Sequence, residues 1–441
     1  MSPRQKQVML AINAFVLFFL MTFIAQVTRA YVGLDYPEVA ANTVSTLITI
    51  PNLSALVFAF LIGPIAVKHN KVTLLSTSII AMIIHCAIYY VNGLMHGPFF
   101  LYMVAGACGG YGIGTYIPLI NGILSDHFPG EERAKRIANY NVFINIGGVI
   151  LMQAAGVLAA KNDGAQWYNA YLLGILAVLG LASFLVLAKK AQIQVPSIEA
   201  ASAPGTQAAS PRIRDIPSRA LYWVVLMGLV HCIFYVTQYA FNTTVSNYII
   251  TEYSLGTSVQ AGTATSLYRF SLIIFTALYP FFQKTLKEWM IPIGYLCVGI
   301  GLIIMMVAKS LFGAYACACF VGLATSLVHA SLYGKASRYV PIVMVPVAMS
   351  LVNGLVSAGS FASVYILDFC SSLLGGGMSN QFLAGAILSV IIAVAAVFMY
   401  VVKKPSYSDD GIVRTNEKTS PRGGLFPAHR SRLCVFEYSI I

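Results

Sequence analysis

The sequence has very little charge for its length. Only 10% of its 441 residues are charged, and 58% are hydrophobic. A soluble domain carries about 25% charged residues, so a water-soluble globular protein is excluded. Apolar runs of about 20 residues are long enough to cross the hydrocarbon of a bilayer as helices. The composition therefore predicts an all-α membrane protein in contact with the lipid bilayer.

The sequence also lacks the motifs of several chemistries. None of its 8 Cys residues forms a Cys-x-x-Cys pair or lies near His at the spacing of metal ligands. No Gly-x-x-x-x-Gly-Lys-Ser/Thr stretch is present, which argues against direct use of ATP. The glycine-rich run at residues 109–114 lies within an apolar run and is interpreted as close helix packing. We therefore predict no metal, no cofactor and no enzymatic activity.

Apolar runs divide the chain into twelve predicted transmembrane helices. The first run lacks a small-residue cleavage site, so it is interpreted as a retained span and not as a signal peptide. The spans are predicted at residues 8–30, 41–67, 72–91, 98–124, 139–160, 168–188, 220–248, 258–282, 289–308, 311–333, 341–369 and 380–402.

The spacing of these runs predicts two bundles of six helices. A stretch rich in Ala, Ser, Pro and Gln separates them, and a polar stretch follows the last span. The predicted domains are an N-terminal bundle at 1–188, a cytoplasmic linker at 189–219, a C-terminal bundle at 220–402 and a disordered cytoplasmic tail at 403–441.

The net charge of +12 is distributed unevenly along the chain. Of the 27 Lys and Arg residues, 23 lie on the side of the predicted membrane that holds both termini. Short loops rich in Lys and Arg stay in the cytoplasm. The charge therefore predicts a cell-membrane protein with both termini in the cytoplasm, and nucleic acid is not expected as a partner.

A short pattern recurs in the two halves of the chain. The pattern Pro-x-x-x-Lys-x-x-Lys occurs at residues 64–71 and again at 280–287, 216 residues later. Asn145 and Asn353 are 208 residues apart in the fifth and eleventh spans. Weak internal symmetry of this kind is typical of transporters built from repeats, so we predict pseudo-symmetric bundles. The gating hinge is predicted at Gly63, Lys68, Lys71, Lys284 and Lys287.

This organisation resembles the major facilitator superfamily over about residues 1–402. The segment GPIAVKHNK at 63–71 is similar to the signature loop of that family, Gly-x-Leu-Ala-Asp-Arg-x-Gly-Arg-Arg. It departs from the signature at Val67, where the family has Asp, and at Asn70, where it has Gly. Tyr102 stands where drug–proton antiporters have Arg, which counts against that subclass. The resemblance implies alternating access, in which two halves rock about a midplane site.

Polar residues of the seventh span form the best candidate substrate site. Their spacing places them on one face of a helix, and in lipid such a face must turn toward protein or water. They are interpreted as a cavity wall or, alternatively, as a hydrogen-bonded seam between helices: His231, Tyr235, Gln238, Tyr239 and Asn242. Four more candidates carry the same two readings: Asn121, Asn145, Gln153 and Asn353.

Arg269 is the sharpest single candidate, because it lies inside the eighth predicted span. A guanidinium suits a carboxylate or phosphate, so we predict a small organic anion as substrate. The alternative is that Arg269 extends to the membrane surface or pairs with Asp368 or Glu252. Asp368 is the one acidic residue inside a predicted span and is the proton-coupling candidate. His85 and His329 are interpreted as structural.

The sequence thus predicts a secondary active transporter, proton-coupled, working as a monomer on a small-molecule substrate. One alternative is an integral membrane enzyme acting on lipid, which requires clustered His, Asp or Glu at the membrane face. The polar stretch at 126–136 is the one loop of that kind. The other alternative is a transport-derived sensor that binds solute without moving it. The departures at Val67 and Asn70 keep this second alternative open.

Overall fold

The computed structural model describes residues 1–128, 130–193, 216–340 and 345–402. Every regular element within these residues is a helix, which agrees with the predicted all-α class. Eleven helical segments in them are long and apolar enough to cross a membrane. The predicted tail at 403–441 and most of the predicted linker at 189–219 lie outside the described residues.

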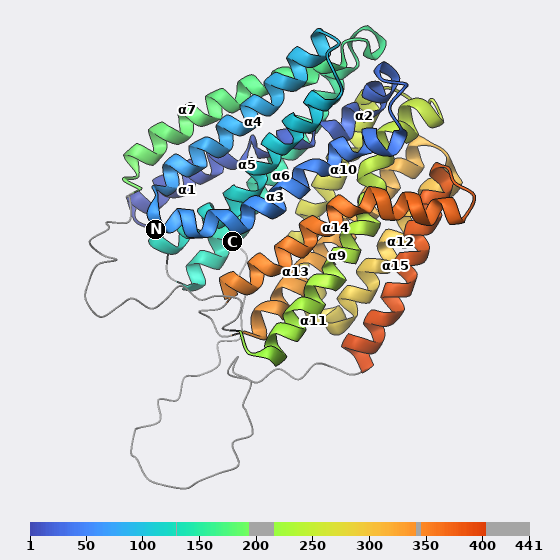
Figure 1. Ribbon diagram of the computed structural model, residues 1–441. Coiled ribbons are helices and arrows are strands. Elements are labelled where there is room, and N and C mark those ends of the chain that lie inside the picture. Colours follow the sequence, from blue (N-terminus) through green and yellow to red (C-terminus); the bar gives the residue numbers. More distant parts are fainter. Residues whose placement is uncertain (129, 194–215, 341–344, 403–441) are drawn as a thin grey trace, which may run out of the picture.

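The helices of residues 1–193 form one group, coloured blue to green in Figure 1. They run up and down, so that consecutive spans are joined at alternate ends of the bundle. The group comprises α1 (Pro3–Val16), η1 (Phe19–Phe23), α2 (Ala25–Asp35), α3 (Ala41–Lys68), α4 (Lys71–Leu94), α5 (Phe100–His127), α6 (Gly130–Ala159), η2 (Lys161–Gly164), η3 (Trp167–Leu173) and α7 (Gly174–Lys190).

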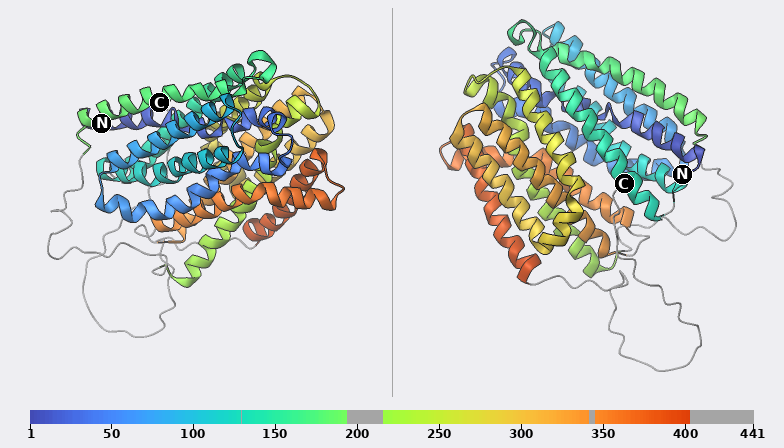
Figure 2. Two further views of the ribbon diagram at one scale, coloured as in Figure 1. Left: turned by 45° about the horizontal axis from the view of Figure 1, so that its top comes forward. Right: turned by 180° about the vertical axis from the view of Figure 1, so that it is seen from behind.

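The helices of residues 216–402 form a second group beside the first, and both views of Figure 2 show the same separation. This group comprises α9 (Ser218–Asn247), η5 (Tyr248–Glu252), α10 (Ser258–Ala277), α11 (Tyr279–Leu286), η6 (Lys287–Trp289), α12 (Met290–Ala308), α13 (Leu311–Arg338), α14 (Val345–Leu373), α15 (Met378–Ala396) and η8 (Val397–Val402).

Two names for the ends of the bundle are used below. The near end is the one that holds the N-terminus and the start of α9. The far end is the opposite one, where residues 36–40, 253–257 and 374–377 connect consecutive spans.

Large apolar side chains remain exposed on the outside of both groups. Ile150 is 60% exposed, Ile175 62% and Phe398 62%. Water would disfavour such surfaces, whereas lipid chains cover them without cost. The outward faces are therefore the lipid-contacting faces, and polar side chains collect inside the bundle.

The first span is longer than predicted and is broken. It runs from Pro3 to Asp35 and not over 8–30, and its three helical pieces meet around Leu17 and Ile24. At the first break α6 approaches closely, because a Cβ on Gly147 would lie 2.0 Å from the carbonyl oxygen of Leu17. Glycine is therefore required at position 147 for the packing of α6 against the first span.

The eighth predicted span also differs from the structure. Residues 258–282 were expected to form one helix, but α10 ends at Ala277 and residues from Tyr279 onward begin a new helix. The segment Tyr279–Ala308 is one of the eleven apolar spans, whereas α10 is not among them. Helix α10 has 20 residues, and it packs between α6 of the first group and α13 of the second. Arg269 lies on this helix.

Candidate functional site

Hydrogen bonds join the two groups from the middle of the bundle to its far end. At the far end Ser258 on α10 donates to the carbonyl oxygen of Gly156 on α6, at 2.7 Å. Nearer the middle, Asn52 on α3 donates through Nδ2 to the hydroxyl of Tyr239 on α9, at 3.0 Å. Tyr239, a predicted site residue, is thus part of the contact between the groups.

Arg269 lies deep in the bundle, between the two groups. It follows the start of α10 at Ser258 by eleven residues, which is about 16 Å along the helix. Its guanidinium carbon lies 5.5 Å from the ring centroid of Phe23 in the first group and 4.9 Å from that of Tyr268. Its aliphatic stem passes Gly148, where a Cβ would lie 3.4 Å from Arg269 Cγ.

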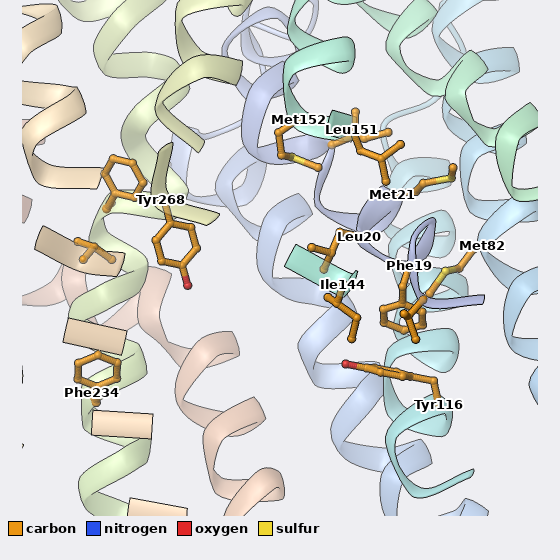
Figure 3. Close-up of a cluster of buried hydrophobic side chains, with 14 of the residues drawn as sticks. Phe19, Leu20, Met21, Met82, Tyr116, Ile144, Leu151, Met152, Phe234 and Tyr268 are labelled. Atoms are coloured by element: carbon orange, nitrogen blue, oxygen red, sulfur yellow. The ribbon is translucent and has the colours of Figure 1, made fainter. Parts of the chain in front are cut away.

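Tyrosines of both groups lie in this part of the bundle. Tyr268 packs against the guanidinium, and its hydroxyl accepts a hydrogen bond from Gln238 of α9. Figure 3 shows the hydroxyl oxygens of Tyr116 and Tyr268 directed toward the space between the groups. Among the described residues no carboxylate forms an ion pair with Arg269, and Asp368 and Glu252 are not its partners. The site therefore presents one positive charge among phenol groups, which suits a bound anion.

The polar face of α9 lies inside the bundle. Three of its predicted site residues are almost fully buried: His231 is 0% exposed, Gln238 1% and Asn242 3%. Gln238 donates through Nε2 to the hydroxyl of Tyr268, at 3.2 Å. Its Oε1, Asn242 Oδ1 and both ring nitrogens of His231 have no hydrogen-bond partner in the protein. Buried polar atoms usually have partners, so these are positions where water or a solute is expected to bind.

His329 and Tyr333 of α13 extend this face toward the near end. The ring centroids of His231 and His329 are 5.0 Å apart, and Tyr235 lies 3.4 Å from His329 through its hydroxyl oxygen and Nδ1. Tyr333 packs on both histidines and donates its hydroxyl hydrogen to Asn353 on α14. His329 was interpreted from the sequence as structural, because helical phase within α13 does not show that it faces α9.

The remaining amide candidates lie in different places. Gln153 accepts a hydrogen bond from Thr263 of α10 at 3.1 Å, in the contact between the groups. Asn145 donates to the carbonyl oxygen of Asn141 on its own helix, at 2.9 Å. Asn121 lies on α5, five residues closer to the near end than Tyr116. His231, His329, Tyr235 and Tyr333 are called the histidine cluster below. Of the four amides predicted outside α9, Asn353 is the one with a described contact to this cluster, through Tyr333.

Asp368 lies near the far end of α14. Its Oδ2 accepts a hydrogen bond from Nδ2 of Asn42, at 3.5 Å. It follows Asn353 by fifteen residues on the same helix, which is about 22 Å along the axis. The carboxylate is therefore too distant for direct contact with the histidine cluster.

The lysines of the predicted hinge lie at the near end. Lys71 forms an ion pair with Asp126, with Nζ 2.5 Å from Oδ2. Lys284 and Lys287 are exposed, and Lys287 has a left-handed φ of 49° where α11 meets η6. The backbone at Gly63 and Lys68 belongs to α3, while the side chain of Lys68 lies outside the described part of the structure.

Arg29 is a buried cation that the sequence placed at the end of the first span. Because α2 continues to Asp35, Arg29 lies inside the bundle and is only 5% exposed. It donates through NH2 to the carbonyl oxygen of Ala41 at 3.0 Å, while its other two nitrogens have no partner in the protein. If the first span had been predicted to extend to Asp35, Arg29 would have been identified as a cation inside the membrane.

Two groups of lipid-facing helices with polar residues gathered between them define a multi-pass membrane transporter fold. Residues 8–241, more than half of the chain, match the family model of the Major Facilitator Superfamily, so the chain belongs to this superfamily. No curated protein matches the chain in sequence.

Solved structures of three transporters show the same fold at low sequence identity. An auto-inhibited POT family peptide transporter is 16% identical with a TM-score of 0.69, over 92% of this chain and 98% of that one. A D-xylose–proton symporter is 15% identical with a TM-score of 0.65, over 90% and 97%. A bacterial homologue of the human lysosomal transporter Spinster, inward-facing and unoccupied, is 15% identical with a TM-score of 0.66, over 91% and 96%. These relatives are transporters, not enzymes.

Proposed function

We propose that the protein is a monomeric secondary active transporter of twelve spans in two pseudo-symmetric six-helix bundles, in which α10 is a span in addition to the eleven apolar segments. An ion pair that recurs supports the repeat. Lys71 and Asp126 join the start of α4 to the end of α5, and Glu288 on η6, directly before α12, pairs with Lys335 near the end of α13. Glu288 lies 217 residues after Lys71, and Lys335 lies 209 after Asp126, close to the two predicted offsets. The acid and the base have exchanged places between the two pairs, so the repeat keeps the position of the ion pair and not the order of its charges.

Alternating access in the cell membrane, with the near end in the cytoplasm, follows from this proposal. The Lys- and Arg-rich segments that the structure describes, such as those of Lys71, Lys284 and Lys335, lie at the near end, as the positive-inside rule requires of cytoplasmic loops. The described hydrogen bonds between the groups, such as Ser258 to Gly156, lie from the middle of the bundle to the far end. Such contacts close the outer side, so this conformation corresponds to the inward-facing state.

The proposed substrate is a small organic anion bound between the bundles. The observation that carries this proposal is the guanidinium of Arg269, which lies between aromatic rings of both groups without an acidic partner among the described residues. Burying an unpaired cation in a membrane is costly, and an anionic substrate would offset that cost. The unpartnered atoms of Gln238 and Asn242 provide polar contacts on the adjacent face of α9.

A thermal-shift screen of the purified protein tests the substrate class. The panel contains lactate, succinate, citrate and inorganic phosphate, with glucose, glycine and tetraphenylphosphonium as neutral, zwitterionic and cationic comparators. We expect a carboxylate to raise the melting temperature, since a ligand that binds only the folded state stabilises it. Uptake of the same radiolabelled carboxylate into proteoliposomes then distinguishes a transporter from a sensor. Stabilisation by the neutral or cationic comparators alone would contradict the anion proposal.

A further inference from the structure

Two histidines meet inside the membrane-spanning part of the protein, where acidic residues are scarce. His231 on α9 is 0% exposed, and its ring centroid lies 5.0 Å from that of the half-buried His329 on α13, with ring planes at 75°. Both nitrogens of His231 lack a partner in the protein. Two imidazoles at this separation can hold one proton between them or through one water molecule.

The groups around the pair include one charge. Tyr235 lies within hydrogen-bond distance of His329, and Tyr333 packs against both rings. Arg269 lies 4.9 Å from the ring centroid of Tyr268, whose hydroxyl accepts from Gln238, seven residues or about 10 Å along α9 from His231. The titratable groups that face the cluster from the elements packed against it are Tyr116, Tyr140, Tyr235, Tyr239, Tyr268, Tyr333 and Arg269. In the described structure Arg269 is thus the charged residue of this set.

We propose that His231 and His329 form the proton-binding site of the transporter and that proton binding is linked to anion binding at Arg269. This inference rests on the proposed function. With the site empty, the positive charge of Arg269 disfavours an imidazolium nearby. A bound carboxylate neutralises that charge, so the pair then takes up a proton more readily. Since linkage is reciprocal, the proton also strengthens anion binding, and the two are carried together in the same direction.

The pair is better placed for this task than Asp368. The α9 face that carries His231 also carries Gln238, which donates to the hydroxyl of Tyr268 beside Arg269, whereas Asp368 bonds to Asn42 at the far end. Only a group that is electrostatically coupled to the substrate site can link proton binding to substrate binding directly.

Charge displacement after a pH step, recorded from proteoliposomes on a solid-supported membrane without added solute, tests the proton site. We expect a transient current in the wild type and at least a tenfold smaller current in His231→Gln/His329→Gln. His329→Gln alone is a milder variant, because this residue is half-buried. The matched control is His85→Gln, since His85 is a buried histidine of α4 bonded to the carbonyl oxygen of Ala105.

The same recordings contain the result that would overturn the proposal. If the double variant keeps the wild-type current while size-exclusion profile and melting temperature show it folded, the histidines are not the proton site. A current that Asp368→Asn removes and both single histidine variants keep also overturns it. If the double variant does not fold, His329→Gln alone decides. A pH midpoint of the current equal to that of the wild type in this single variant contradicts a proton shared by the two histidines.

A second arm tests the linkage with lactate and succinate as probes. We expect either anion, if it stabilises the protein, to shift the pH midpoint of the current upward by about one unit, within the usual range of allosteric coupling. Stabilisation without a shift overturns the linkage and leaves the proposed function intact. If neither a carboxylate nor phosphate stabilises the wild type or shifts its pH midpoint, the proposed function fails, while the pH-step current still decides the histidine site.

Discussion

Replacing Arg269 is the most direct perturbation of the proposed anion site. The guanidinium lies 5.5 Å and 4.9 Å from two ring centroids and has no ion pair among the described residues. A carboxylate substrate would therefore be its main charged partner. Hydrogen bonds to charged groups contribute about 1.5–3 kcal/mol each. Because the side chain is only half-buried, we take about 2–3 kcal/mol for the whole interaction and expect Arg269→Ala to weaken binding about 30- to 150-fold.

Two milder variants separate charge from geometry. Arg269→Lys keeps the charge and loses the planar fork that binds a carboxylate through two parallel hydrogen bonds, so we expect about tenfold weaker binding. Arg269→Gln keeps hydrogen-bond donors and loses the charge, and its effect should approach that of alanine. This ranking follows from an anion site and not from a cavity that merely needs a long polar side chain.

Isothermal titration with the carboxylate found by the thermal-shift screen provides the dissociation constants. Arg136→Ala is the control, because Arg136 also lies over an aromatic ring, with its guanidinium carbon 5.7 Å from the Phe128 centroid, but at the near end of the bundle. We expect this control to bind the carboxylate as the wild type does. An unchanged dissociation constant in Arg269→Ala would refute the reasoning, and so would an equal loss in the control.

Three other predictions concern positions away from Arg269. Gly156→Ala puts a Cβ 2.5 Å from the backbone oxygen of Ser258 and so loosens the contact that closes the far end. We expect a cysteine introduced at the far end to react with a thiol reagent about tenfold faster in this variant. Gly334→Ala, with nothing within 4 Å of the new Cβ, should leave the rate unchanged, and equal rates in the two variants would contradict this. Asp126→Lys should lower the melting temperature modestly, because an exposed pair contributes at most about 1 kcal/mol, and Lys71→Asp added to it should restore stability, as the reversed pair of the second bundle implies. Arg29→Met should raise the melting temperature, since a buried cation without an acid is replaced by an apolar chain; a lower value argues that Arg29 has a charged partner.

The helical architecture was predictable because lipid imposes a simple rule. A run of apolar residues long enough to cross the hydrocarbon has to satisfy its backbone within a helix, so eleven segments could be identified from composition. Helix α10 is the weak case, because Arg269 and several Ser and Thr residues lower its hydropathy. The break near Leu17 was not predictable, since it depends on how closely Gly147 of another helix approaches.

The candidate site was predictable only where one helix supplies it. Helical periodicity identified the polar face of α9, because residues at spacings of three, four and seven share a face. Periodicity does not specify which residue of another helix faces that stripe. His329 therefore escaped functional assignment, although it lies 5.0 Å from His231 between ring centroids. Arg29 was missed for another reason, since the end of a span is set by packing and not by hydropathy alone.

The contacts around α9 separate the two interpretations that its polar face allowed. A seam between helices requires each polar group to find its partner on a neighbouring helix. That holds for Tyr239, which accepts from Asn52, but Asn242 Oδ1 and both nitrogens of His231 have no partner in the protein. Each such atom would cost about 1–3 kcal/mol if nothing bonded to it, and a leucine there would avoid the cost. A seam therefore accounts for Tyr239, while His231 Nδ1 and Nε2 and Asn242 Oδ1 have no such partner in the protein, which is the observation that favours the proposed cavity at these two residues.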